Sequence, residues 1–363
     1  MASSTDRDAP LLVPAVASPA GLSRRGFVGV SAALAGGAAF LGPSVAQADA
    51  AKTAASPPPG FSPLSAPGRI VKVSKANTLQ PNGLWPKADV AKMMLERVMT
   101  EFTGEATLEK AVGRFFHKDD RVAIKVNGIA GQKGATMGSN KELVLPFIDA
   151  LLALGIPPAS VWVYEQYYMT GTRIDDKSLP KGVKSYNHGN GQATMDEISV
   201  GGIKTKFTKY LTDATAVANF SLIKDHGICG YTGLMKNMTH GSNVNPQDFH
   251  AHGAAPQIAH LYAQDAIKSR VRLNITDGFK LMYEGGPIDR RPDCRPPHEA
   301  VYACTDPVAM DTLGAHLVDK IRVEKGMKTL ADARRDPMYI RQAAELGLGV
   351  GRLDDIRLRE VAI

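Results

Sequence analysis

The chain has 363 residues and a formal net charge of +7, from 43 lysines and arginines against 36 aspartates and glutamates. The basic residues are spread along the sequence without a long run of like charges, which argues against a nucleic-acid-binding protein. The net positive charge is compatible with small anionic ligands. Three cysteines are too few for a disulfide framework or a four-cysteine iron–sulfur site. Cys294 and Cys304 either form a disulfide bridge or, as we favour, remain free thiols.

The first 48 residues have the features of an export signal. Arg24 and Arg25 are followed by a weakly apolar run, rich in alanine and interrupted by glycine, and then by an Ala-Gln-Ala sequence that ends at Ala48. Such a run is a poor membrane span, whereas paired arginines before it are typical of the twin-arginine route. We therefore predict a signal peptide over residues 1–48, recognised by the twin-arginine export machinery, and a location in the periplasm, the cell envelope or outside the cell. A general secretory signal or an uncleaved membrane anchor is the alternative.

Two further segments follow the signal. Residues 49–67 are rich in alanine, serine and proline, which predicts a linker, and residues 68–363 are expected to form a single α/β domain without a membrane span. Strands are predicted over residues 69–73, 121–126, 160–164, 204–210, 216–223, 272–276, 300–304 and 356–361, and helices over residues 88–102, 141–154, 306–321 and 336–346. This alternation favours a mainly parallel sheet with helices on both faces. Asp306 followed by Pro307 predicts the N-cap of the third of these helices.

Polar side chains follow two of the predicted strands. Lys125 and Asn127 close the strand over residues 121–126, and Lys224 and His226 follow the strand over residues 216–223. Ligand sites in parallel sheets lie off the carboxyl ends of the strands, so we expect these side chains to share one site. The alternative is that these lysines are ordinary surface residues.

Residues 227–256 are rich in glycine, asparagine and histidine and have little periodicity, which predicts a long loop insertion. Its glycines allow the backbone to approach a ligand closely and leave amide groups for an anion. The stretch has neither the ending of a phosphate-binding P-loop nor the spacing of a dinucleotide fingerprint. Lys236 and Asn237 follow these glycines and are candidates for binding a carboxylate or a phosphate.

Histidines in this region suggest a metal site. His250 and His252 would share one face of an extended chain, and with His226 or His240 they form a candidate site for a divalent transition metal. Asp277 directly follows a predicted strand, where it would complete the metal site or act as a base. The alternative is a set of separate loop histidines that hydrogen-bond to the backbone.

Several motifs resemble, in their order along the chain, the "domain of unknown function 362" family over roughly residues 69–363. They are Ile124-Lys125-Val126-Asn127, Lys224-Asp225-His226, Thr232, Lys236-Asn237, His250, Asp277-Gly278, Gly286-Pro287, the run from Asp306 to Asp311 and the run from Glu345 to Gly349. The resemblance implies an α/β fold and leaves the activity open. Some relatives carry ferredoxin-type cysteine clusters; this chain lacks such a module, so no iron–sulfur cluster is expected.

These interpretations together predict an exported, metal-assisted enzyme that acts on a small anionic substrate. The substrate-binding candidates are Lys125, Asn127, Lys236 and Asn237, the catalytic candidates are Lys224, His226 and Asp277, and the metal-ligand candidates are His226, His250, His252 and Asp277. The alternative is a non-catalytic accessory protein of the cell envelope that binds a metal or an organic anion.

Overall fold

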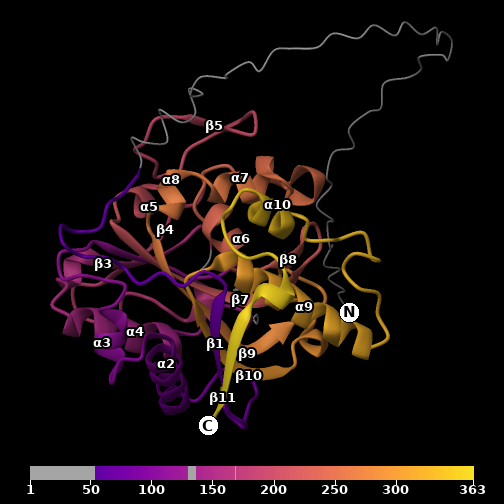
Figure 1. Cartoon of the computed structure of the whole chain (residues 1–363), viewed down its shortest axis with the longest axis horizontal. Coiled ribbons are helices and arrows are strands. Elements are labelled where there is room, and N and C mark those ends of the chain that lie inside the picture. The colour runs from indigo at the N-terminus through magenta and orange to yellow at the C-terminus, as the bar shows by residue number, and fades with distance from the viewer. Residues whose placement is uncertain (1–53, 130–135, 168) are drawn as a thin grey trace, which may run out of the picture. The chain divides into compact units, whose positions relative to one another are not determined.

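A computed structural model describes residues 54–129, 136–167 and 169–363. The predicted signal peptide over residues 1–48 lies outside these residues. A central sheet of nine strands organises the described chain (Figure 1). Its strands are β1 (Arg69–Ser74), β2 (Val122–Lys125), β3 (Val161–Glu165), β4 (Lys184–Asn187), β7 (Ala216–His226), β8 (Gly230–Thr232), β9 (Val271–Met282), β10 (Pro297–Cys304) and β11 (Arg357–Ala362). A separate hairpin pairs β5 (Ile198–Val200) with β6 (Ile203–Thr205).

The strand order is β11-β1-β10-β9-β7-β2-β3-β4, and β8 pairs with β7. The five strands from β9 to β4 run parallel to one another, as β11 does to β1. Within this central sheet, only the pairs made by β10 and β8 are antiparallel among the described strands. The prediction of a mainly parallel α/β sheet is therefore confirmed, and the carboxyl ends of β2, β3, β7 and β9 meet at one edge.

Helices cover both faces of this sheet. One face packs against α2 (Ala88–Thr103), α3 (Leu108–Val112) and α4 (Lys141–Ala153); the other packs against α5 (Lys209–Thr212), α6 (Leu234–Thr239), α7 (Gln257–Tyr262), α8 (Asp265–Lys268), α9 (Pro307–Glu324) and α10 (Tyr339–Glu345) (Figure 1). Short 3₁₀ turns are η1 (Pro158–Ser160), η2 (Thr170–Thr172), η3 (Pro246–Ala254), η4 (Pro292–Cys294) and η5 (Leu353–Asp355). Two apolar layers thus enclose the sheet, because its central strands are apolar on both faces.

The start of α9 confirms the predicted cap. Asp306 accepts a hydrogen bond from the Ala309 amide at 2.9 Å, and Pro307 is the first helical residue. The same carboxylate accepts from the Gly68 amide at 2.9 Å and from the Val350 amide at 3.0 Å. One helix cap therefore also joins the first strand of the sheet to the C-terminal segment.

Four segments differ from the sequence prediction. The strand predicted over residues 204–210 is divided between β6 and α5, and β7 and β9 extend past their predicted ends, to His226 and Met282. The predicted loop over residues 227–256 contains β8, α6 and η3. Every residue of α6 is buried, so its sequence carries no amphipathic period from which a helix could be recognised.

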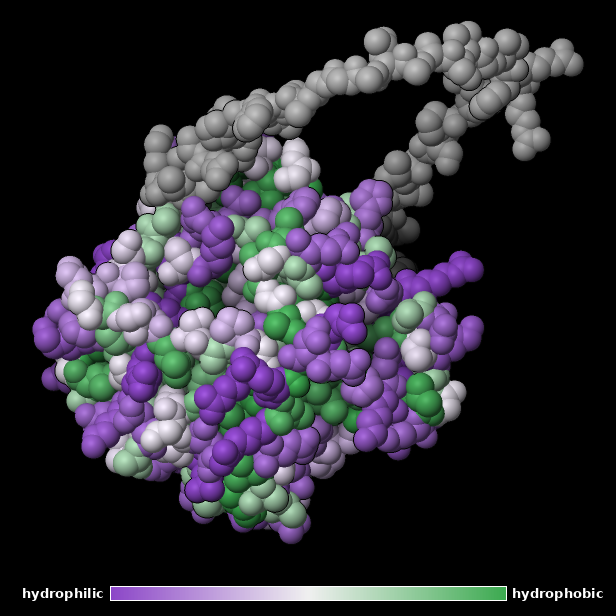
Figure 2. Space-filling model, in the orientation of Figure 1, coloured by the Kyte–Doolittle hydropathy of each residue, from purple (hydrophilic) through white to green (hydrophobic). Residues whose placement is uncertain are grey.

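Hydrophobic residues on the face shown in Figure 2 are scattered among polar ones. Within the described ranges, no helix has both the length and the apolar character needed to cross a membrane. All three cysteines are buried and free, as favoured from the sequence.

Candidate functional site

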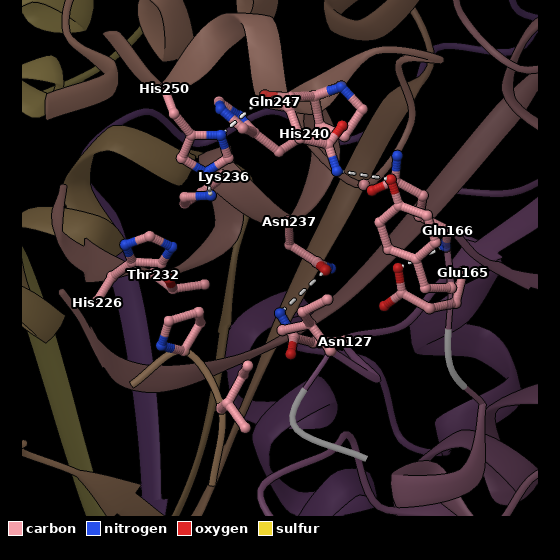
Figure 3. A pocket seen from close by; sticks show the side chains of 16 residues that line it. Asn127, Glu165, Gln166, His226, Thr232, Lys236, Asn237, His240, Gln247 and His250 are labelled. Atoms are coloured by element: carbon pink, nitrogen blue, oxygen red, sulfur yellow. Dashed lines mark hydrogen bonds between the residues drawn. The ribbon is translucent and has the colours of Figure 1, made fainter. Parts of the chain in front are cut away.

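A pocket of about 210 Å³ opens at the carboxyl edge of the parallel strands (Figure 3). Its wall includes Asn127 and Ile129 after β2, Glu165, Gln166 and Tyr167 at the end of β3, His226 of β7, Thr232 of β8, Lys236, Asn237, His240 and Gly241 in and after α6, Pro246, Gln247 and His250 of η3, and Pro287 and Ile288. Five of the predicted site residues are thus brought together: Asn127, His226, Lys236, Asn237 and His250.

Lys125 lies behind this wall, and the Glu165 carboxylate balances its positive charge. Its ammonium donates to Glu165 Oε1 at 3.1 Å, to Asn237 Oδ1 at 3.1 Å and to the Val126 carbonyl at 2.5 Å. Burial lowers the pKa of Lys125, and the Glu165 carboxylate opposes that shift. Because all three N–H groups have acceptors, Lys125 supports the pocket rather than binding a ligand directly.

Gly241 permits this arrangement. A Cβ atom at this position would lie 2.4 Å from both the Asn237 carbonyl oxygen and the Lys125 side chain. Only glycine lets the chain after α6 pass so close to the buried ammonium.

Lys224 is a second buried lysine beside the pocket, and its charge is less well balanced. Its ammonium donates to Asn127 Oδ1 at 2.9 Å, and it forms no ion pair with a carboxylate in the described chain. Burial is the main cause that lowers the pKa of Lys224, to about 7. The antiparallel pairing of β8 with β7 places Thr232 opposite Lys224.

Lys236 is the third buried lysine and lines the pocket itself. Its ammonium donates to His250 Nε2 at 3.2 Å, because His250 Nδ1–H is engaged with the Pro246 carbonyl at 2.8 Å. Burial lowers the pKa of Lys236, and burial together with the Lys236 charge lowers the pKa of His250 to about 4. His250 is therefore a neutral acceptor at physiological pH.

His226 faces His250, with ring centroids 5.8 Å apart. His226 Nδ1 accepts from the amides of Ile228 at 3.1 Å and Cys229 at 3.3 Å. Burial, followed by the charge of Lys236, lowers the pKa of His226 well below its usual value. The neutral ring therefore carries its proton on Nε2, which makes that nitrogen a donor.

His240 has a structural role beside these groups. Its Nε2 is 3.0 Å from the Phe249 carbonyl oxygen and its Nδ1 is 3.2 Å from Thr239 Oγ1. Both ring nitrogens are therefore engaged within the protein.

The α6 helix positions Lys236 and Asn237. Its N-terminus is capped by Asp311 of α9, which accepts from the amides of Leu234 at 2.6 Å and Met235 at 3.1 Å. The Asn237 side chain is saturated: Oδ1 accepts from Lys125 and from Asn127, and Nδ2 donates to Asn219 Oδ1 and to the Phe220 carbonyl. Asn237 therefore orients its neighbours, whereas Asn127 retains one Nδ2 hydrogen for a ligand.

Two predicted metal ligands lie away from the pocket wall. Asp277 lies within β9 rather than after it, and its Oδ2 accepts from the backbone amide of Asn140 at 2.7 Å and its side chain at 2.9 Å, next to α4. His252 is exposed and adopts a left-handed conformation, with φ of 52° and ψ of 40°. In the part of the chain that the structure describes, no three His, Cys, Asp or Glu side chains are arranged to hold a metal ion.

Several residues of the pocket wall were not among the predicted site residues, and Glu165 and Thr232 are the two with the clearest chemistry. Glu165 ends β3, beside β2. The rule that ligand groups lie off the carboxyl ends of parallel strands, by which Lys125 was selected, therefore applies to Glu165 equally. Thr232 has a buried hydroxyl without a hydrogen-bond partner in the described chain. Thr232 is among the motifs that carry the family resemblance, but its short strand has no periodic sequence signal, so the sequence does not assign it to the site.

The fold and the pocket define an α/β protein with a pocket, lined in part by lysine and histidine, at the carboxyl edge of a parallel sheet. Residues 122–316 match the family model described as "Domain of unknown function (DUF362)". The match covers more than half of the chain, so this protein belongs to that family. It includes every predicted site residue from Lys125 to Asp277. No curated protein matches the chain at a significant level.

Proposed function

We propose that this protein is an exported enzyme that binds a small anionic substrate, a carboxylate or a phosphate, in the pocket. The observation that supports this proposal is the lack of a carboxylate partner for two buried lysines in the described chain. Lys224 and Lys236 each have one hydrogen-bond acceptor and no carboxylate partner among the described residues. Buried charges are costly unless they are paired, so a bound anion would supply the missing partner.

The pocket supplies groups for chemistry on such a substrate. Lys236 would hold the anion, with Lys224 adding positive charge from behind Asn127. The Nε2–H of His226 would donate to a substrate oxygen that gains negative charge during the reaction. His250 would keep the Lys236 ammonium oriented toward the anion, because its Nε2 accepts one of the hydrogen bonds of that ammonium.

The predicted metal is not needed in this scheme, since the described histidines and carboxylates do not converge on a common point. A non-catalytic anion-binding protein is the second candidate. It is favoured by the engagement of both His240 nitrogens and both His250 nitrogens within the protein. Only turnover of a substrate would separate these two functions.

Replacing Lys236 with methionine tests the proposal. The Lys236→Met variant should bind acetate or inorganic phosphate about ten- to a hundredfold more weakly, because hydrogen bonds to charged groups contribute about 1.5–3 kcal/mol. Isothermal titration calorimetry would measure both affinities. Lys204→Met is the matched control, since Lys204 is 78% exposed and pairs with Glu197. Equal affinities in the Lys236→Met variant and the wild type would contradict the proposed site.

Export is tested separately through the arginine pair. Replacing Arg24 and Arg25 with lysine should retain the uncleaved precursor inside the cell, because the twin-arginine machinery recognises that pair. Fractionation and immunoblotting would compare this double variant with Arg7→Lys, which changes an arginine outside the pair. Normal export of the double variant would show that another route is used.

A further inference from the structure

The pocket has two chemically different ends (Figure 3). His226, Thr232, Lys236 and His250 gather at one end, and Glu165 and Gln166 lie at the other, with the Asn127 and Asn237 side chains between them. The first end carries the unbalanced ammonium of Lys236, and the second carries a carboxylate. A ligand that spans the pocket therefore meets donors at one end and an acceptor at the other.

The donor end has hydrogen-bonding capacity that the protein does not use. The Thr232 hydroxyl is buried and unpartnered within the described chain, and Thr232 is 3% exposed. His226 presents Nε2–H, since its Nδ1 is occupied by backbone amides. A carboxylate has two oxygens and four acceptor positions, which suits several converging donors of this kind.

The acceptor end is formed by Glu165, which is held rigidly. Its Oε1 accepts from the Lys125 ammonium and from the Gln166 amide at 2.6 Å, and its Oε2 accepts from the Gly128 amide at 2.6 Å. Oε2 thus keeps acceptor capacity, while the negative charge of Glu165 would repel a second anionic group. Glu165 therefore selects a ligand end that donates a hydrogen bond.

We propose that the ligand is a small organic acid with one carboxylate, held by Lys236, His226 and Thr232, and a hydroxyl or amino group at its far end, which donates to Glu165. This inference rests on the proposed function and specifies its substrate class. Inorganic phosphate and dicarboxylates fit less well, because the first lacks a distant donor and the second places a like charge at Glu165.

A matched ligand series tests the inference on the unmodified protein. For each of three chain lengths, from three to five carbons, calorimetry would compare the methyl-terminated acid, the hydroxyl-terminated acid, the amino-terminated acid and the dicarboxylate. At one chain length, the hydroxyl- or amino-terminated acid should bind roughly tenfold more tightly than the methyl-terminated acid and the dicarboxylate. Because no variant is needed, a folding defect cannot obscure this result.

Glu165→Gln gives a second measurement. This variant should lose the preference for a donor-terminated acid and bind the dicarboxylate relatively better, while the methyl-terminated acid is little affected. Glu197→Gln, at an exposed ion pair, is the control. If a dicarboxylate or inorganic phosphate bound the wild type more tightly than every donor-terminated acid, the inference would be overturned. The proposed anion site would remain intact. Failure of every acid and of phosphate to bind would overturn both.

Discussion

Replacing Asp120 with alanine should lower the free energy of unfolding by about 3–5 kcal/mol, the cost of leaving a buried charge without its partner. Asp120 precedes β2 and Arg272 lies in β9. The carboxylate accepts two hydrogen bonds from the guanidinium, at 2.7 Å and 3.1 Å, and the two side chains are 0% and 4% exposed. Two further donors, the His117 amide at 2.8 Å and Thr215 Oγ1 at 2.7 Å, complete its shell.

This pair joins the amino-terminal side of the parallel strands, at the opposite edge from the pocket. Denaturant unfolding would measure the change, and acetate binding by the folded variant should stay at the wild-type level. Asp119→Ala is the matched control, because the neighbouring carboxylate pairs with Lys118 at the surface, where both side chains are more than half exposed. An Asp120→Ala variant no less stable than the Asp119→Ala variant would show that the buried pair adds no net stability.

The expectation that polar groups at the carboxyl ends of parallel strands lie together placed four predicted residues at one edge of the sheet. Lys125, Asn127, Lys224 and His226 lie at the ends of β2 and β7, because parallel strands bring their carboxyl ends to one edge. The rule failed for Asp277 because β9 runs on through it to Met282, and β10 pairs with β9 beyond Asp277 as far as Lys280.

Other parts of the site depend on contacts that sequence spacing does not carry. His250 and His252 would share a face only in an extended chain, whereas His252 has a φ of 52°. The cap of α6 comes from Asp311, 77 positions along the chain from Leu234. The proton position on His226 depends on two backbone amides in the following turn. Local patterns predict the strands and the longer helices, but a turn or cap made by distant residues requires the fold.

The affinity of the pocket for acetate should fall as the pH rises through about 7. Burial lowers the pKa of Lys224 from 10.5 to about 7, with Glu165 and Asp289 opposing the shift and Lys236 and Lys125 increasing it. Below that pH the ammonium is charged and attracts an anion; above it the amine is neutral. A bound anion favours the charged form, so binding takes up a proton and affinity falls by up to about tenfold per pH unit.

The stability of the unliganded protein should respond in the opposite direction. Between the folded pKa of about 7 and the ordinary value of 10.5, the unfolded chain binds more protons at Lys224 than the folded chain does, so the contribution of Lys224 to stability rises with pH.

Acetate is the suitable probe of the affinity because its own charge is constant from about pH 6 to about pH 9, whereas phosphate titrates in that range. Calorimetry over this range would measure how the acetate affinity changes with pH. The Lys224→Met variant should bind acetate more weakly at the acidic end, and its affinity should depend less on pH. An affinity that stays constant across this range in the wild type would show that the Lys224 charge does not act on the bound anion.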